Sequence, residues 1–172
     1  MKPVQPEMSA ERMRAYLTEV GGILAARGLT GELVLAGGAV MVMALEARGG
    51  SGDIDAVFAQ EAKAIVEAAK EVATKHGLPA AWLNDHVRVF IAPDAPIVDF
   101  FEVPGLRVRM VRLDYLFYMK AWAGSPLDQR DLRKIAKALA VEDEHQAYDI
   151  VRGYSPGELP RDVQILLESL FE

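Results

Sequence analysis

The sequence predicts an α+β protein in which a small mixed sheet is covered by helices and followed by a helical C-terminal part. Short apolar runs bounded by glycine or proline recur up to about residue 111, as is typical of buried strands. Between them, apolar residues recur at helical spacing, and beyond residue 112 only the helical spacing continues. We therefore expect an α/β core over residues 1–112 and a helical region over 113–172 that packs on this core.

Composition limits the class of protein. The chain has 172 residues and is 51% hydrophobic, which suits one compact domain with a small helical extension. It contains no apolar run of membrane-spanning length, its first residues are polar, and it has no cysteine. We expect a cytoplasmic protein without a membrane partner. The net charge of −6 argues against nonspecific coating of nucleic acid, because that binding needs a basic surface.

The first half of the chain should alternate helices and strands. Ser9 is a good N-cap for a helix that ends near Gly28. Residues 33–36 form a short apolar run, which predicts a buried strand, and a glycine pair follows it. The remaining expectations are a helix over 39–47, a flexible loop over 48–52, a strand over 53–59 and a covering helix over 61–76.

The second half should contain a hairpin and then only helices. Residues 82–85 are typical of a turn or a short helical piece, and residues 87–91 alternate as a strand would. A hairpin is expected around Pro104 and Gly105, with strands over 97–103 and 106–111. The helices that follow are predicted at 113–123, 127–139, 143–151 and 161–171.

Two aspartates in the second predicted strand are the first candidates for chemistry. Alternation along a strand places Asp53 and Asp55 on one face and turns Ile54 and Ala56 into the core. Two neighbouring carboxylates repel one another unless a cation lies between them, and hard divalent cations prefer carboxylate oxygens. The pair therefore indicates a site for Mg²⁺ or Mn²⁺. The alternative is a solvent-facing acidic pair at the end of a strand.

A third carboxylate would complete such a site. Asp99 and Glu102 lie in one predicted strand, and their odd spacing predicts opposite faces, so that only one of them can join the pair. Asp99 lies in the middle of the strand, where an unpaired charge is harder to explain. We therefore expect Asp99 to complete the metal site with Asp53 and Asp55.

Other residues are candidates for binding phosphate. Gly37 and Gly38 follow a buried strand and open a helix, where backbone N–H groups favour an anion. Arg48 and Ser51 lie in the loop before the aspartates and are expected to contact phosphate. The alternatives are a tight turn that needs no side chain at the glycines, and a solvated position for Arg48 and Ser51.

A lysine in the first C-terminal helix is the sharper signal. Lys120 follows Leu113, Leu116 and Phe117 at helical spacing, which predicts that it lies on the apolar face, where lysine is uncommon unless paired or snorkelling. It is a candidate for binding triphosphate. Asp131 borders the apolar stripe of the next helix, and we expect it to orient Lys120 or position a nucleophile; the alternative is an acid favoured by the helix dipole.

Arginines on the last predicted strand form the best local basic patch. Arg107 and Arg109 share a face, and Arg112 follows them. The patch is a candidate for an RNA backbone. An exposed edge strand protected by charges explains the same pattern.

These residues resemble the nucleotidyltransferase fold, the polymerase-beta-like superfamily. The stretch GGAVMVMALEARGGSGDIDAVF is similar to its signature of glycine turn, helix and D-x-D strand. The segments WLND, LDYLFYMKAWA, QRDL and LPRDVQILLESLF are similar to a small subfamily related to toxins of toxin–antitoxin and abortive-infection systems. The resemblance spans nearly the whole chain.

The resemblance implies a role for each candidate residue. Gly37 and Gly38 match the glycine-serine motif, with glycine in the place of serine as in the toxin-like members, and Asp53 and Asp55 match the metal-binding aspartates. Asp99 matches the third carboxylate, which activates the attacking hydroxyl. Lys120 and Asp131 match the lysine and aspartate of the toxin-like members.

Together, the resemblance and the residues lead us to expect a metal-dependent transferase that moves NMP from an NTP to a hydroxyl of tRNA or of a protein. A toxin with a cognate antitoxin is part of this expectation. Two other hypotheses stay open at this point. The first is a catalytically inactive module that binds a nucleotide or a partner, and the second is an enzyme that adenylylates an antibiotic.

Overall fold

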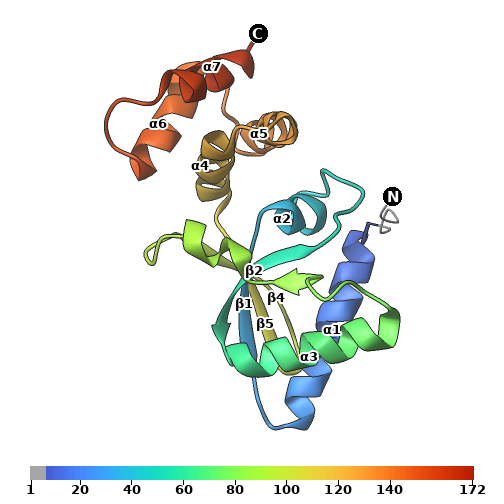
Figure 1. Ribbon diagram of the computed structural model, residues 1–172. Helices are drawn as coiled ribbons and strands as arrows, with labels where there is room; N and C mark the ends of the chain where they lie inside the picture. Colours follow the sequence, from blue (N-terminus) through green and yellow to red (C-terminus); the bar gives the residue numbers. More distant parts are fainter. Residues whose placement is uncertain (1–6) are drawn as a thin grey trace. The chain divides into compact units, whose positions relative to one another are not determined.

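The structure is a computed structural model that describes residues 7–172, and it is a mixed α+β protein, as the sequence predicts. The described chain divides into two compact units: an α/β unit that ends at Val111 and a helical unit over Arg112–Glu172. Figure 1 shows the elements of each unit. Within residues 7–172, none of the helices combines the length and the hydropathy that a membrane span requires.

The α/β unit is built on a mixed sheet of five strands in the order β3-β2-β1-β5-β4. β1 runs antiparallel to β2 and parallel to β5, while β4 and β5 form the predicted antiparallel hairpin. The strands are β1 (Gly31–Ala36), β2 (Ile54–Gln60), β3 (Leu83–Asn84), β4 (Ile97–Val103) and β5 (Leu106–Val111).

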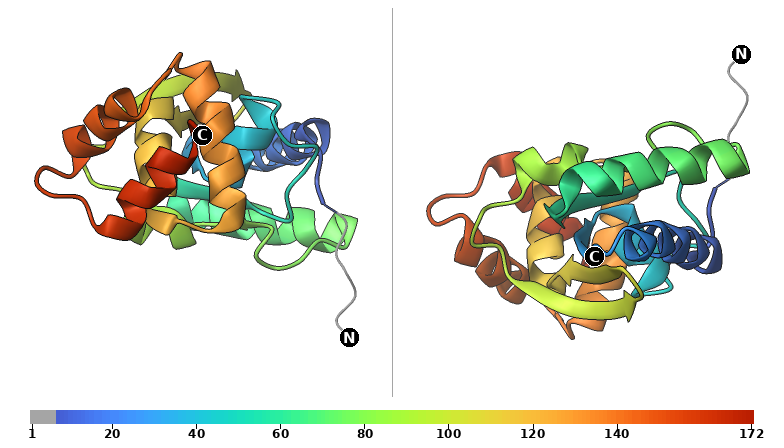
Figure 2. Two further views of the ribbon diagram at one scale, coloured as in Figure 1. Left: turned by 90° about the horizontal axis from the view of Figure 1, so that it is seen from above. Right: turned by 90° about the horizontal axis from the view of Figure 1, so that it is seen from below.

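Helices α1 (Ala10–Ala26) and α3 (Ala62–His76) cover one face of this sheet, where they lie side by side (Figure 2). The helix α1 begins as predicted, because the side chain of Ser9 accepts a hydrogen bond from the backbone N–H of Arg12. Trp82 is fully buried, and its indole N–H donates to the carbonyl oxygen of Ala69 in α3 at 2.9 Å. The apolar residues of α1, α3 and the covered sheet face form the core of the unit.

The opposite face of the sheet carries the candidate residues. Asp55 lies opposite Ala36, and Val57 lies opposite Val34, so these four side chains share that face. Their neighbours along β2, Ile54 and Ala56, are fully buried under the helices, as the alternation predicts. The helix-covered face therefore holds the core, and the other face presents Asp55.

Three local predictions are wrong. Residues 82–85 contain strand β3 rather than a turn, since Leu83 and Asn84 pair with Ile54 and Asp55. Residues 87–91 are not a strand: the 3₁₀ helix η1 spans His86–Phe90. The helix α2 (Gly38–Met43) is also shorter than expected and stops well before residue 47.

The helical unit consists of four helices, α4 (Leu113–Ala123), α5 (Pro126–Ala138), α6 (Glu144–Tyr154) and α7 (Arg161–Ser169). The start of α5 is specified by a capping box in which Ser125 and Asp128 exchange hydrogen bonds with each other's backbone N–H groups, and Pro126 occupies the first turn. Gly124 ends α4 in the left-handed conformation. The turn between α4 and α5 is therefore encoded locally, and the apolar faces of the helices form the unit's own core.

Candidate functional site

The glycine turn after β1 lies against Asp55, one member of the aspartate pair. Gly37 has φ 63° and ψ −141°, a conformation that only glycine adopts readily. A Cβ built on Gly37 would lie 3.3 Å from Oδ2 of Asp55. The backbone of the turn thus approaches the Asp55 carboxylate closely, and this approach depends on glycine for both conformation and space.

The second glycine faces the two loop residues that the sequence singles out. A Cβ on Gly38 would lie 2.9 Å from Nη1 of Arg48 and 3.2 Å from Oγ of Ser51. Arg48 and Ser51 are both partly buried. The structure therefore brings Gly37, Gly38, Arg48, Ser51 and Asp55 together, and a guanidinium and a hydroxyl beside a bare backbone turn are groups that suit a phosphate.

Asp53 lies at the entrance to β2, and an asparagine from the neighbouring strand holds it. The amide of Asn84 donates to Oδ2 of Asp53 at 3.4 Å and to the carbonyl oxygen of Ala81 at 3.0 Å. Asn84 also accepts from the backbone N–H of His86, and it is 7% exposed. The sequence interpretation missed Asn84, because residues 82–85 did not read as a strand that pairs with β2.

The structure does not bring Asp99 to the aspartate pair. Asp99 lies on β4, and β1 and β5 separate β4 from β2. Three interstrand steps of about 4.8 Å place the two strands about 14 Å apart, too far for one metal ion. Asp99 instead pairs with Arg109 at 2.9 Å, and its side chain is 87% exposed. Among residues 7–172, no group of three or more acidic or histidine side chains could hold a metal ion.

The prediction that Asp99 and Glu102 lie on opposite faces of β4 is also wrong. A β-bulge between Asp99 and Phe101 shifts the register, so that Asp99 lies opposite Arg109 and Glu102 lies opposite Arg107. One extra residue on the bulged strand changes the parity, and both acids therefore face the arginine side of β5. Asp99 was preferred to Glu102 as a third ligand because side chains alternate in direction along a regular strand, and the bulge interrupts this alternation.

The same pairs neutralise the predicted basic patch. Arg107 pairs with Glu102 at 3.5 Å, and Arg109 pairs with both Asp99 and Glu32. In addition, β5 lies inside the sheet, between β1 and β4, so these arginines do not protect an edge. Arg112 belongs to the helical unit and binds Asp114 through two hydrogen bonds. Each arginine of the patch has an acidic partner.

Lys120 is buried in the helical unit, as its spacing predicts. It is 7% exposed, and its Nζ lies 2.8 Å from Oδ2 of Asp131 and 3.2 Å from Oδ1 of Asp128. Asp131 is 1% exposed, and Asp128 is also held by Ser125. Asp131 therefore orients Lys120, as expected, and one lysine is shared by two carboxylates. A contact between Lys120 and triphosphate stays a prediction.

A pocket of about 340 Å³ opens on the Asp55 side of the sheet. Val34 and Val57 form its floor, and the segment from Arg88 to Ile97 covers it. Val57 follows Asp55 by two residues on the same face, which corresponds to roughly 7 Å along the strand. The pocket thus begins two residues along β2 from Asp55, on the same face of the sheet.

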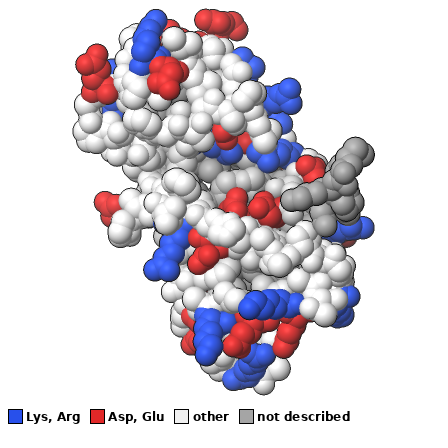
Figure 3. Space-filling model, in the orientation of Figure 1, with Lys and Arg blue, Asp and Glu red and all other residues white. Residues whose placement is uncertain are grey.

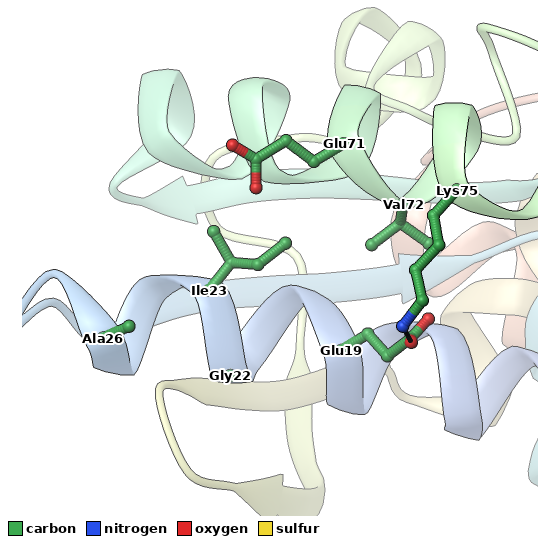
Figure 4. Close-up of a pocket in the computed structure, with 7 residues that line it drawn as sticks. All are labelled: Glu19, Gly22, Ile23, Ala26, Glu71, Val72 and Lys75. Carbon is green, nitrogen blue, oxygen red and sulfur yellow. Dashed lines mark hydrogen bonds and ion pairs between the residues drawn. The ribbon is translucent and has the colours of Figure 1, made fainter.

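A second pocket, of about 400 Å³, lies between α1 and α3 (Figure 4). Ile23 and Val72 point into it from the two helices, and Lys75 reaches across to Glu19 with a 2.6 Å ion pair. The pocket is on the helix side of the sheet, opposite to Asp55. Its charged rim joins the two helices, and none of the candidate residues lines it.

Comparisons of this chain with protein-family models, with curated proteins and with solved structures find no match. The function of this protein is therefore inferred from the geometry of its residues. That geometry gathers the aspartate pair, the glycine turn, the two loop residues and Asn84 at one end of β1 and β2, beside an apolar pocket.

Proposed function

We propose that this protein is a metal-dependent nucleotidyltransferase that moves NMP from an NTP to a hydroxyl group. One observation carries the proposal: a carboxylate pair and a phosphate-suited turn meet at the same end of the sheet. Asp55 lies against Gly37, while Arg48 and Ser51 lie against Gly38. An NTP needs both kinds of group, because its phosphates are anionic and are usually bound with a divalent cation.

The donor set suits Mg²⁺ or Mn²⁺. Asp53 and Asp55 are hard oxygen ligands two residues apart, and Asn84 holds one oxygen of Asp53 in place. Mg²⁺ in nucleotide sites is commonly bound by one or two carboxylates together with substrate phosphates, so a third protein carboxylate is not required. Asp53 and Asp55 would hold the ion, which would neutralise charge on the reacting phosphates.

The chain's own groups have separable roles in this proposal. The turn at Gly37 and Gly38, with Arg48 and Ser51, binds the β- and γ-phosphates that leave as pyrophosphate. Asn84 positions Asp53. Lys120 lies in the helical unit, where Asp128 and Asp131 hold its ammonium group, and its binding to phosphate stays a prediction. Asp99 has no role here, because its partner is Arg109.

The partners of this reaction belong to the same proposal. A hydroxyl of tRNA or of a protein is the acceptor that the resemblance suggests, and a cognate antitoxin would be a protein partner. An inactive module that only binds nucleotide is the competing function. Turnover distinguishes the two, because both share the nucleotide site.

The test is transfer of label from NTPs. Purified full-length protein is incubated with each α-labelled NTP, Mg²⁺ or Mn²⁺, and total tRNA or a protein extract. We expect label in an acceptor, a dependence on the metal, and a loss of 100-fold or more in Asp53→Asn and in Asp55→Asn. The matched control is Asp149→Asn, an exposed aspartate of α6, which should retain full activity.

NTP binding is measured in parallel by isothermal titration calorimetry. Metal-dependent binding that is lost in Asp55→Asn, without transfer to any acceptor, would favour the inactive module. Absence of both binding and transfer in the wild-type protein would refute the nucleotide site altogether.

A further inference from the structure

The pocket beside Asp55 suggests which kind of acceptor this enzyme takes. It measures about 340 Å³, which is within the range of small-molecule sites. Among the described residues, its lining is apolar, Val34, Val57 and Ile97 included, apart from the charged side chain of Arg88. The floor belongs to β1 and β2, so the pocket and the carboxylates share rigid elements.

The order of groups along the sheet assigns the pocket to one side of the reaction. Gly37 follows the end of β1, Asp55 lies opposite Ala36, and Val57 lies opposite Val34. The turn, the carboxylate and the pocket therefore follow one another in a line. In phosphoryl transfer the attacking and leaving oxygens are roughly in line through the phosphorus. If pyrophosphate leaves at the glycine turn, the attacking hydroxyl comes from the pocket.

The lining determines the chemistry of the occupant. Burying an apolar group in an apolar pocket lowers the free energy of binding. Burying a charged group that has no partner there raises it. A polycationic aminoglycoside would bring several ammonium groups against valine, isoleucine and Arg88, which is unfavourable. A ring or short aliphatic body with a hydroxyl at one end and an anionic group near Arg88 satisfies the apolar surface and the guanidinium together.

We propose that this pocket binds the acceptor, and that the acceptor is a hydroxylated compound or side chain with an apolar body, a phenol being the best-fitting class. This rests on the proposed function. The phenolic oxygen forms a bond to the α-phosphorus of the NTP, the bond from that phosphorus to the bridging oxygen breaks, and pyrophosphate leaves. The phenolic proton passes to water. The products are an aryl ester of NMP and pyrophosphate, and no oxidant or reductant is needed.

The first test measures binding without any reaction. The probe is 4-hydroxyphenylacetate, and tyramine is the comparison, since it has the same ring and hydroxyl with a cation in place of the anion. We expect ligand-observed NMR of the full-length protein to show binding of 4-hydroxyphenylacetate and at least fivefold weaker binding of tyramine. Arg88→Gln should remove this difference without abolishing binding of the ring.

Filling the pocket supplies the structural control. Ala59 is an exposed residue at the bulge of β2 and lines the pocket, so Ala59→Trp should fill it without touching the carboxylates. The matched variant is Ala138→Trp on the exposed surface of α5. We expect at least tenfold weaker probe binding in the first variant and unchanged binding in the second. No binding by wild-type protein, or equal binding by both variants, overturns the proposal.

The second test measures transfer from labelled ATP. We expect AMP on the phenolic oxygen of 4-hydroxyphenylacetate, with the KM for this acceptor raised tenfold or more by Ala59→Trp and ATP binding unchanged. Transfer to kanamycin or to tRNA that Ala59→Trp does not affect overturns the acceptor assignment and leaves the proposed function intact. ATP binding that does not depend on Asp55 counts against the proposed function instead. In that case the probe-binding result still shows whether the pocket binds a phenol.

Discussion

At the scale of the residue, Gly37 is restricted both by its backbone conformation and by the atoms around it. Its backbone conformation belongs to a region that costs other residues about 1–3 kcal/mol. The Asp55 carboxylate also lies where a side chain at this position would be. The turn could therefore not be built with a serine or alanine at this position without strain. A side chain at Gly37 would therefore both destabilise the fold and displace the Asp55 carboxylate.

Gly37→Ala should lower the free energy of unfolding by about 1–3 kcal/mol, because the new Cβ would occupy a strained conformation 3.3 Å from Asp55 Oδ2. Urea denaturation followed by circular dichroism measures the change. The control is Gly22→Ala in α1, where a Cβ meets no atom within 4 Å. There the helix propensity of alanine should raise stability by about 0.5–1 kcal/mol. Equal effects of the two substitutions would contradict the strain at Gly37.

Asp114 is a second residue with a measurable signature. Arg112 donates to it at 2.7 and 2.9 Å, Tyr154 donates at 2.5 Å, and these contacts, the arginine first, lower its pKa below the usual value. A lowered pKa in the folded state means that the ionised form stabilises the fold. This contribution is complete above the pKa of the unfolded chain, near 4, and is lost as the pH falls through the folded value.

Asp114→Asn should therefore cost about 1–2 kcal/mol between pH 5 and 8, and the cost should shrink as the pH falls below about 4. Urea denaturation at pH 7 and at pH 3.5 measures both values. Asp149→Asn on the exposed surface of α6 serves as the control and should be neutral at both pH values. A cost that is the same at pH 3.5 and pH 7 would refute the ion pair as its cause.

At the scale of the element, a cluster of charged side chains lies inside the apolar interface between α4 and α5. Lys120 comes from α4, whereas Asp128 and Asp131 come from α5. Buried charges are costly to desolvate, and they persist here because each finds a partner. No buried side-chain nitrogen or oxygen of the described residues lacks a hydrogen-bond partner.

Lys120→Met should lower the free energy of unfolding by about 3–5 kcal/mol, because it keeps the volume and leaves two carboxylates without their cation. Thermal and urea unfolding measure this loss. Lys137→Met, an exposed lysine of α5, should change stability by no more than about 0.5 kcal/mol. The double variant Lys120→Met/Asp131→Leu should recover part of the loss. If the single variant costs under 1 kcal/mol, the cluster does not hold α4 and α5 together.

At the scale of the whole molecule, charge is balanced locally and acidic in sum. The net charge is −6, yet acidic and basic side chains are interspersed on the face of the molecule that Figure 3 shows. On the α/β unit, Arg27 pairs with Glu67 and Glu71. Arg107 pairs with Glu102, and Arg109 pairs with Asp99, on the neighbouring strand. A surface of this kind has little attraction for a phosphate backbone.

Nonspecific binding to nucleic acid should therefore be weak and should strengthen when the arginines of β5 lose their partners. We expect the variant Asp99→Asn/Glu102→Gln to bind a labelled single-stranded RNA several-fold more tightly than the wild type, with a steeper dependence on salt. Fluorescence anisotropy at low and physiological salt measures both. The control Asp149→Asn/Glu144→Gln removes two negative charges from α6 instead. An equal gain in RNA affinity in this control would show that net charge alone is responsible.

Most elements could be predicted from the sequence because their signals are local. The hairpin over Ile97–Val103 and Leu106–Val111 has the predicted bounds, since its turn and its apolar strands are adjacent in the chain. The burial of Lys120 followed from helical spacing alone. The face of the sheet on which Asp55 lies was likewise predicted from strand alternation, because side-chain direction repeats every two residues.

The tertiary structure decided which distant residues meet. Strand order places Asp99 three strands from Asp55, and a bulge gives Asp99 and Glu102 the same face. The pairing of β3 with β2 brings Asn84 to Asp53, and the 3₁₀ helix η1 follows β3 in the chain. Neither strand order nor a bulge is encoded by local periodicity, because both depend on how the whole sheet buries its apolar surface. The sequence by itself determined the aspartate pair and the glycine turn; only the fold decided their neighbours and the pocket beside them.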